Sequence, residues 1–321
     1  MGGWAEWEDG QNWQMGRMGR AGLLAALIAI GLVWGMTIPL TKVAVSTGHH
    51  PAGLILWQVV FGALFLGAVV AARGLRLGRL TRAGAYLGAV ALIGTVIPNS
   101  TSFLAARHLP AGVMGLNIAV IPMVALVLAH WAGAERATAR RLLGVAFGAA
   151  AILLLVGPEA SLPDPGATVF VLVALIAPLC YGAEGVFIAK RAPRDLDPIE
   201  TLFGASVLAA ILLAPIALSQ GWAVDLGGAW AAPEWAMLAA ALLHAIAYSG
   251  YIWLVGRAGP VFTSQLSYVV TIASVALSMT VLGERYSTWV WLAFALMLGG
   301  LALVQPRAEE EAAPPKTDQP V

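Results

Sequence analysis

The sequence predicts an all-α integral membrane protein with ten transmembrane helices, arranged as two inverted five-helix repeats around a central cavity. Of its 321 residues, 60% are hydrophobic and 11% are charged, whereas soluble domains carry about 25% charged residues. Apolar stretches of membrane-spanning length run from Leu23 to Val304, and the second five echo the first five. Because each repeat holds an odd number of spans, the two copies have to lie upside down relative to each other.

Each span is expected to be a helix, because backbone groups in lipid have to form hydrogen bonds within their own segment. A β-barrel would need alternating strands of about ten residues, and the run of Leu, Ala and Ile at 23–30 does not alternate. The predicted spans are residues 22–44, 52–72, 84–106, 111–131, 141–157, 167–189, 199–219, 234–256, 261–282 and 287–305.

Basic residues lie mainly on one side of the predicted membrane. With the N-terminus inside, all of the 18 Lys and Arg residues except Lys42, Arg107 and Arg285 fall in cytoplasmic segments. Cytoplasmic loops carry an excess of Lys and Arg. We therefore expect a multi-pass protein of the cell (inner) membrane with both termini in the cytoplasm.

Composition also excludes several classes of protein. The net charge of +1 argues against a nucleic-acid partner, and Cys180 is the single cysteine, which excludes a disulfide framework or a cysteine-based metal cage. His49 and His50 have no other metal ligands nearby in the sequence. The chain has no Walker A motif and no motif of an intramembrane hydrolase. We expect no cofactor, no metal site and no enzymatic activity.

Short motifs recur at a spacing of about 150 residues, in the same order in both halves. The pairs are Trp34-Gly35 with Tyr181-Gly182, Pro51 with Pro198, Arg107…Pro110 with Arg257…Pro260, and Ala134-Glu135-Arg136 with Gly283-Glu284-Arg285. The predicted organisation is a cytoplasmic N-terminal tail (1–20), a first five-helix repeat (21–157), a linker (158–166), a second five-helix repeat (167–305) and a disordered cytoplasmic C-terminal tail (306–321).

This duplicated pattern resembles the EamA family of the drug/metabolite transporter superfamily over about residues 20–305. The resemblance is carried by Ala111-Gly112 and Gly259-Pro260 at the start of the fourth and ninth spans, by Pro122, and by Glu284-Arg285 before a glycine-rich last helix. It implies that spans 1–4 and 6–9 surround a central cavity and that spans 5 and 10 are peripheral. It also implies export or exchange of amino acids and other small metabolites. The ninth span departs from the pattern, because Thr271 or a neighbour stands where a proline would echo Pro122.

Glu184 is the one acidic residue well inside a predicted span. An ionised carboxylate at the centre of a membrane helix costs about 3 kcal/mol, which favours a function as a proton carrier or as the counter-charge of a cationic substrate. The alternative is that Glu184 snorkels to the cytoplasmic side or pairs with a basic residue such as Lys190.

The eighth span carries His244, Tyr248 and Tyr251, whose spacings of four and three residues put them on one helical face. We expect this face to line the cavity, and His244 competes with Glu184 as the proton-coupling group because imidazole titrates near neutral pH. The alternative for His244 is an interhelical hydrogen bond.

Polar residues of the ninth span form a stripe of Ser264, Ser267, Thr271, Ser274 and Ser278. Small hydroxyl residues either line a wet cavity or allow close helix packing, and the stripe leaves both open. Gln265 and Tyr268 lie beside it and are the predicted hydrogen-bonding contacts of the substrate.

In the first half, Asn99 and Asn117 are the matching polar candidates for substrate binding. Trp34 and Tyr181 are equivalent in the repeat and are predicted to flank an aromatic or apolar part of the ligand. Pro98 and Pro122 free backbone carbonyls and are expected to bend their helices.

Lys42 lies near the outer end of the first span, where it would either hold a substrate carboxylate or reach the lipid headgroups with its long side chain. Short spacings of glycine at 31 and 35, and at 144 and 148, predict close helix contacts.

The sequence therefore predicts a secondary transporter, not driven by ATP, that moves a small organic metabolite by alternating access. The resemblance implies an amino-acid-like substrate and export. The alternative is a proton-coupled exporter of organic cations or drugs that uses Glu184. A scaffold without transport activity would gain nothing from an inverted repeat. The expected partners are a small-molecule substrate and the lipid bilayer, with no nucleic acid, and the protein is expected to be a monomer or a homodimer.

Overall fold

The computed structural model describes residues 19–46, 48–74, 77–133, 137–158, 161–193 and 195–305. The predicted C-terminal tail, residues 1–18 of the N-terminal tail and the motif Ala134-Glu135-Arg136 lie outside these residues. All regular elements in the described part of the chain are helices, and none is a strand.

Most helices cover one predicted span each, and the third and fourth spans are divided. In chain order the elements are α2 (Arg20–Ala44), α3 (Pro51–Ala72), α4 (Leu77–Arg82), α5 (Gly84–Ala91), the π-helix η2 (Leu92–Val96), α6 (Ile97–His108), α7 (Ala111–Ile118), α8 (Ile121–Trp131), α9 (Ala139–Val156), the 3₁₀ turn η3 (Pro165–Ala167), α10 (Thr168–Arg191), α11 (Pro198–Ser219), α12 (Ala232–Ser264), α13 (Leu266–Leu282) and α14 (Thr288–Val304).

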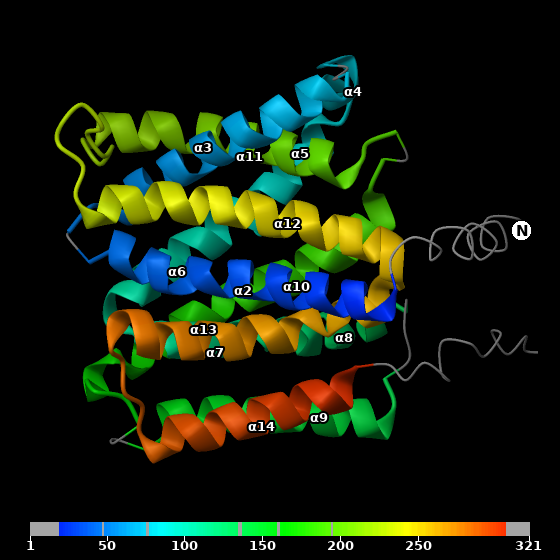
Figure 1. Cartoon of the computed structure of the whole chain (residues 1–321), viewed down its shortest axis with the longest axis vertical. Helices are drawn as coiled ribbons and strands as arrows, with labels where there is room; N and C mark the ends of the chain where they lie inside the picture. Colours follow the sequence, from blue (N-terminus) through cyan, green and yellow to red (C-terminus); the bar gives the residue numbers. More distant parts are fainter. Residues whose placement is uncertain are drawn as a thin grey trace, which may run out of the picture.

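Within the described ranges, eight helical segments are long and apolar enough to cross a membrane. The protein is therefore a multi-pass membrane protein, and the full count of ten spans remains our proposal. The helices lie roughly side by side between two ends of the molecule (Figure 1). We call the end that holds the start of α2 and the end of α14 the terminal end, and the end that holds the α2–α3, α6–α7 and α13–α14 connections the loop end (Figure 1).

Helix contacts repeat with the two halves exchanged. In the first half α2 packs against α12 and α13, and in the second half its equivalent, α10, packs against α6 and α8. The second helices of the halves, α3 and α11, contact each other, as do the fifth helices, α9 and α14. α2 runs from the terminal end to the loop end, whereas α10 runs the opposite way (Figure 1).

The matched glycines Gly35 and Gly182 make the same close contact in the two halves. A Cβ atom at Gly35 would lie 3.1 Å from the backbone nitrogen of Ser274, and one at Gly182 would lie 3.1 Å from the backbone nitrogen of Ala125. Such a distance is tighter than most contacts of a real Cβ atom. Glycine is therefore needed at both positions for the backbones of the neighbouring helices to approach.

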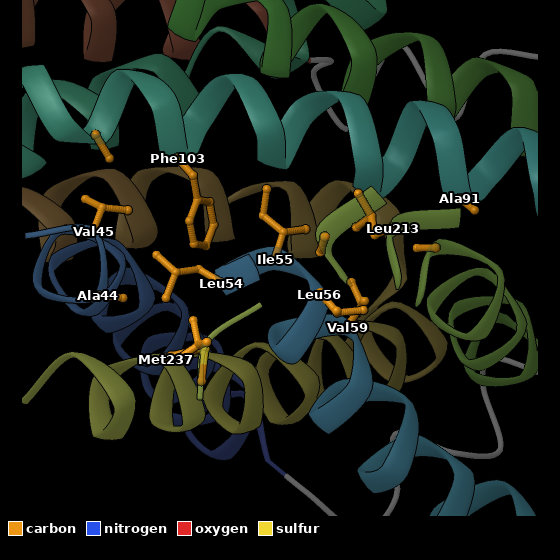
Figure 2. Packing of buried hydrophobic residues seen from close by; sticks show 14 of the residues in the cluster. Ala44, Val45, Leu54, Ile55, Leu56, Val59, Ala91, Phe103, Leu213 and Met237 are labelled. Carbon is orange, nitrogen blue, oxygen red and sulfur yellow. The ribbon is translucent and has the colours of Figure 1, made fainter. Parts of the chain in front are cut away.

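The apolar core around α3 joins the two halves of the molecule (Figure 2). Leu54 and Ile55 of α3 are completely buried. Val45, at the end of α2, and Phe103 of α6 belong to the same cluster as Met237 of α12. Lipid tails are as apolar as these side chains, so removal from water does not drive their contacts within the membrane. In a membrane the packing itself is the larger part of the gain.

Pro98 and Pro122 interrupt their helices, as predicted. The π-helix Leu92–Val96 leads into α6, where Pro98 is the second residue, and α7 ends at Ile118, before α8 resumes next to Pro122. Proline has no N–H, so the carbonyl four residues earlier loses its helical donor. These irregular turns lie in the middle of the third and fourth spans.

The predicted boundary between the eighth and ninth spans, at residues 256–261, agrees with the apolar segment that begins at Phe262, but it does not coincide with a break in the helix. α12 continues to Ser264, and the junction with α13 falls at Gln265. The equivalent segment of the first half does break, because α6 ends at His108 and α7 begins at Ala111. Charged side chains bind the free backbone groups of that first break, whereas the backbone at 257–260 keeps its helical course and loses only the bond that a proline cannot donate.

Candidate substrate site

Trp34 of α2 lies against the polar face of α12. Its ring centroid is 5.7 Å from that of His244, 6.4 Å from that of Tyr248 and 6.1 Å from that of Tyr251. The three contacts are edge-to-face, the favourable geometry for aromatic pairs. The prediction that His244, Tyr248 and Tyr251 share one helical face is thus confirmed, and Trp34 joins that face. We call these four residues the aromatic wall.

The repeat-equivalent position carries a polar arrangement. The Tyr181 hydroxyl of α10 donates a hydrogen bond of 3.2 Å to Oδ1 of Asn99 on α6. One turn further along α10, the carboxylate of Glu184 lies directly against Gly94 of the π-helix, where any Cβ atom would collide with both carboxylate oxygens. We call Asn99, Tyr181 and Glu184 the polar wall.

Glu184 forms no hydrogen bond or ion pair with any residue in the described part of the chain. Lys190, the nearest basic residue of the same helix, donates instead to the carbonyl of Ala132 at 2.9 Å. Glu184 precedes the end of α10 at Arg191 by seven residues, about 10 Å along the helix axis. The geometry thus gives the snorkelling interpretation no basic partner and leaves the carboxylate available to a ligand or a proton.

One turn after Glu184 on α10, the ring of Phe187 stacks on Tyr86 of α5, with centroids 5.7 Å apart. Sequence reasoning did not single out Tyr86 or Phe187. The position of Phe187 three residues after Glu184 on one helical face was the signal available for it.

Asn117 is buried at the break of the fourth span. Its residue is 3% exposed, and neither amide atom has a hydrogen-bond partner in the structure. It lies one residue before Ile118, the last residue of α7. An unpaired buried amide costs roughly 1–3 kcal/mol, so a ligand group or water bound at this break would be stabilising.

Gln265 and Tyr268 are not brought to either wall. The side-chain amide of Gln265 donates to Gln305 at the end of α14, with N and O 2.5 Å apart. Tyr268 lies in the first turn of α13, three residues after Gln265. Both residues therefore lie at the terminal end, where α13 starts and α14 ends.

The hydroxyl residues of the α13 stripe differ in their contacts. Ser274 donates to the carbonyl of Thr271 at 2.8 Å and Ser278 to that of Ser274 at 2.6 Å, and all three residues are fully buried. Ser274 also lies against Gly35 and Gly115. These contacts favour close packing for Ser274 and Ser278, whereas the hydroxyl of Thr271 has no partner in the structure.

Lys42 is bound by backbone carbonyls of the α6–α7 connection. Its ammonium donates to the carbonyls of Ala106 at 2.7 Å and of Leu109 at 2.8 Å, with Arg107 at 3.4 Å. An ammonium has three donors, so these carbonyls satisfy it. Neither interpretation of Lys42 from the sequence anticipated this contact.

Glycine spacings in α2 and α9 serve packing, as predicted. A Cβ atom at Gly31 would collide with Val269 of α13, and one at Gly144 would lie 2.6 Å from the carbonyl oxygen of Gly300 on α14. Among the residues that the structure describes, no three His, Cys, Asp or Glu side chains lie together in a group that could hold a metal ion.

Comparison with known proteins agrees with this architecture. The sequence model of a family described as the EamA-like transporter family matches residues 20–157 and 168–305. One solved structure, described only as "Crystal structure of protein", shares 20% sequence identity with a TM-score of 0.60, over 88% of this chain and 96% of that chain. At this identity the likeness concerns the fold alone. No curated protein matches the chain.

Proposed function

Because the chain belongs to the EamA-like transporter family, we propose that it is a secondary transporter that moves a small organic metabolite by alternating access, without ATP. The family membership itself gives a membrane transporter of the drug/metabolite type. The observation that supports a substrate site in this chain is the pairing of two repeat-equivalent walls, one aromatic and one carrying Glu184 without a basic partner. Ionisable groups inside a membrane bundle are costly and are retained for function.

The proposed substrate is amino-acid-like, and the proposed direction is export. A substrate ammonium group would bind Glu184 and the faces of Trp34 and Tyr248, because aromatic faces attract cations. The amides of Asn99 and Asn117 would bind the uncharged polar groups or the carboxylate. The halves would rock about the close glycine contacts. The chamber between the aromatic wall and the polar wall, which we call the substrate chamber, would then open first to one side of the membrane and then to the other.

Exchange of organic cations or drugs for protons is the second candidate, and the isolation of Glu184 favours it. A carboxylate without a basic partner can be neutralised either by a proton or by a cation, and the two compete. Release of the cation on one side would then follow protonation of Glu184, and loss of that proton on the other side would restore the site. His244 is the second proposed proton carrier, through its place on the aromatic wall.

We propose ten spans in two inverted repeats around a central cavity, residues 21–157 and 167–305, in the cell (inner) membrane with both termini in the cytoplasm. The protein would act as a monomer or a homodimer, with no cofactor, metal or nucleic acid. Transporters of this family are typically not enzymes, and we propose no enzymatic activity for this protein.

Uptake into proteoliposomes tests the proposal. A panel of labelled amino acids, amines and a cationic dye would be assayed with and without a pH gradient, for the wild type, Glu184→Gln and Glu184→Asp. An amino-acid carrier transports at least one amino acid, and a proton-coupled cation exporter requires the pH gradient and an acid at 184. Failure of every compound in the panel, with a correctly folded protein, would contradict both candidates.

A further inference from the structure

The α6–α7 corner at the loop end is a helix break whose backbone groups are bound by side chains. α6 ends at His108 and α7 begins at Ala111. At such a break the last carbonyls of one helix and the first N–H groups of the next have no helical partner. Pro110, the residue before α7, provides no side-chain cap. The ammonium of Lys42 binds the free carbonyls on the α6 side, as described above.

Glu284 binds the free N–H groups on the α7 side. Its two carboxylate oxygens accept hydrogen bonds from the backbone nitrogens of Ala111 at 2.7 Å and Gly112 at 3.1 Å. The Tyr286 hydroxyl donates to the second oxygen at 2.6 Å. Burial, together with the neighbouring carboxylate of Glu284, raises the pKa of Tyr286 above its ordinary value, so the phenol remains a donor.

Both charges match the polarity of the helix ends. An anion is favoured at a helix N-terminus and a cation at a C-terminus, and Lys42 and Glu284 also attract each other. Ala106, Leu109 and Ala111, which lie around the two charged groups, are buried. A Cβ atom at Gly112 would collide with the phenol of Tyr286, so the glycine allows this fit.

The two charged residues differ in the half of the molecule from which they come. Lys42 belongs to the same repeat as α6 and α7, so its bonds lie within one repeat, although its helix α2 packs mainly against α12 and α13 of the other repeat. Glu284 and Tyr286 lie in the α13–α14 connection of the other repeat. If the two repeats separate at the loop end, the bonds of Lys42 stay within one repeat, whereas those of Glu284 join the two repeats and have to break. The arms of the corner also carry Asn99 and Asn117, the polar groups of the proposed site.

We propose that Glu284, supported by Tyr286, is a releasable latch that keeps the loop end of the transporter closed, while Lys42 is a permanent brace of the α6–α7 corner. This inference rests on the proposed alternating access. It assigns the opening step at the loop end to one carboxylate and two backbone N–H groups of the opposite repeat.

Accessibility of a single cysteine tests the latch without a substrate. Asn117→Cys is introduced in a Cys180→Ser background of the full chain, and a membrane-impermeant maleimide is added on the side of the loop end. Glu284→Gln loses the charge that binds the α7 N-terminus and is expected to raise the labelling rate about tenfold, the equivalent of one charge-assisted hydrogen bond. Tyr286→Phe removes a single bond and is expected to raise it by a smaller factor, about threefold.

Two variants serve as matched comparisons. Lys42→Met is expected to lower the melting temperature in detergent without raising the labelling rate of the folded fraction. Arg285→Gln, next to Glu284 and exposed, is expected to change neither. Equal labelling of the wild type, Glu284→Gln and Tyr286→Phe would overturn the latch and leave the proposed function intact. If position 117 is labelled in no variant from either side, the alternating access itself fails.

Discussion

Trp34 and Tyr181 occupy equivalent positions of the two repeats, and their surroundings share a backbone and differ in chemistry. Each precedes a glycine that lies against the backbone of the fourth or ninth span. Trp34 then meets three rings of α12, whereas Tyr181 meets Asn99 and stands beside Glu184. The two repeats thus share the same backbone contact at the glycine, whereas the side chains around Trp34 differ from those around Tyr181.

This difference between the two walls would fix the orientation of a ligand in the proposed chamber. An aromatic wall alone binds apolar or cationic surfaces, and an unpaired carboxylate binds a cation or a proton. A ligand that satisfies both has a positively charged group near Glu184 and a flat or apolar part near Trp34. Two identical walls would fit a symmetric ligand instead.

Replacement of Glu184 is expected to have the largest effect, because it removes the charge that distinguishes the walls. Glu184→Gln should lower transport of a cationic or zwitterionic substrate about tenfold to a hundredfold, the range of a hydrogen bond to a charged group. The thermal midpoint should not fall, since no partner is lost. Transport by Glu184→Gln at the wild-type rate and with the wild-type pH dependence would remove Glu184 from the mechanism.

Substitution of the paired glycines tests the shared backbone. Gly35→Ala and Gly182→Ala should each destabilise the fold by about 1–3 kcal/mol, because the added methyl group overpacks a helix contact. Gly185→Ala on α10 is the control, since a Cβ atom there meets nothing within 4 Å. Thermal unfolding in detergent measures all three. A large effect at only one of the paired positions would show that the two contacts are not equivalent.

Truncation of Trp34 tests whether the aromatic wall contacts the substrate. Trp34→Ala should raise the KM about tenfold, since it removes a cation–π contact and aromatic packing, and Trp34→Phe should recover most of the loss. Trp289→Ala on the peripheral helix α14, where the side chain is partly exposed, should leave the KM unchanged. Equal effects of the two alanine variants would contradict a ligand contact at Trp34.

Removal of the Tyr181 hydroxyl is expected to have the smallest effect. Tyr181→Phe breaks one neutral hydrogen bond to Asn99, which is worth about 0.5–1.5 kcal/mol, so transport should fall only a few-fold. If Asn99→Ala in the Tyr181→Phe background adds nothing, the pair acts as one unit. A hundredfold loss in Tyr181→Phe alone would assign the hydroxyl a direct contact with the substrate.

Much of the fold was predictable from the sequence, because lipid leaves few alternatives. Apolar stretches without alternation had to become helices, and the helices are irregular next to Pro98 and Pro122, whereas Pro39, Pro178 and Pro215 lie inside continuous helices. The α12–α13 junction at Gln265 was not predictable, because Gly259-Pro260 permits a break without requiring one. Whether the helix ends there depends on side chains that bind the free backbone groups, as Lys42 and Glu284 do at the α6–α7 corner.

For the candidate site, the sequence predicted which residues share a helical face, but it did not predict which helix each face contacts. Helical spacing put His244, Tyr248 and Tyr251 on one side of α12, and the repeat paired Trp34 with Tyr181. Spacing cannot tell how deep a residue lies or which helix it meets. Gln265 and Tyr268 were therefore expected at the site, although they lie where α13 starts and α14 ends. Tyr86 was overlooked because it is distant from Glu184 in the sequence.

Substrate protection of two cysteines tests most directly whether the two walls enclose one chamber. Asn99→Cys on the polar wall and Tyr251→Cys on the aromatic wall are made separately in a Cys180→Ser background and labelled with a small maleimide. The account predicts that both are labelled and that one transported compound slows the labelling of both. Labelling of neither position, or protection of one wall while the other is unaffected, would contradict a shared substrate site.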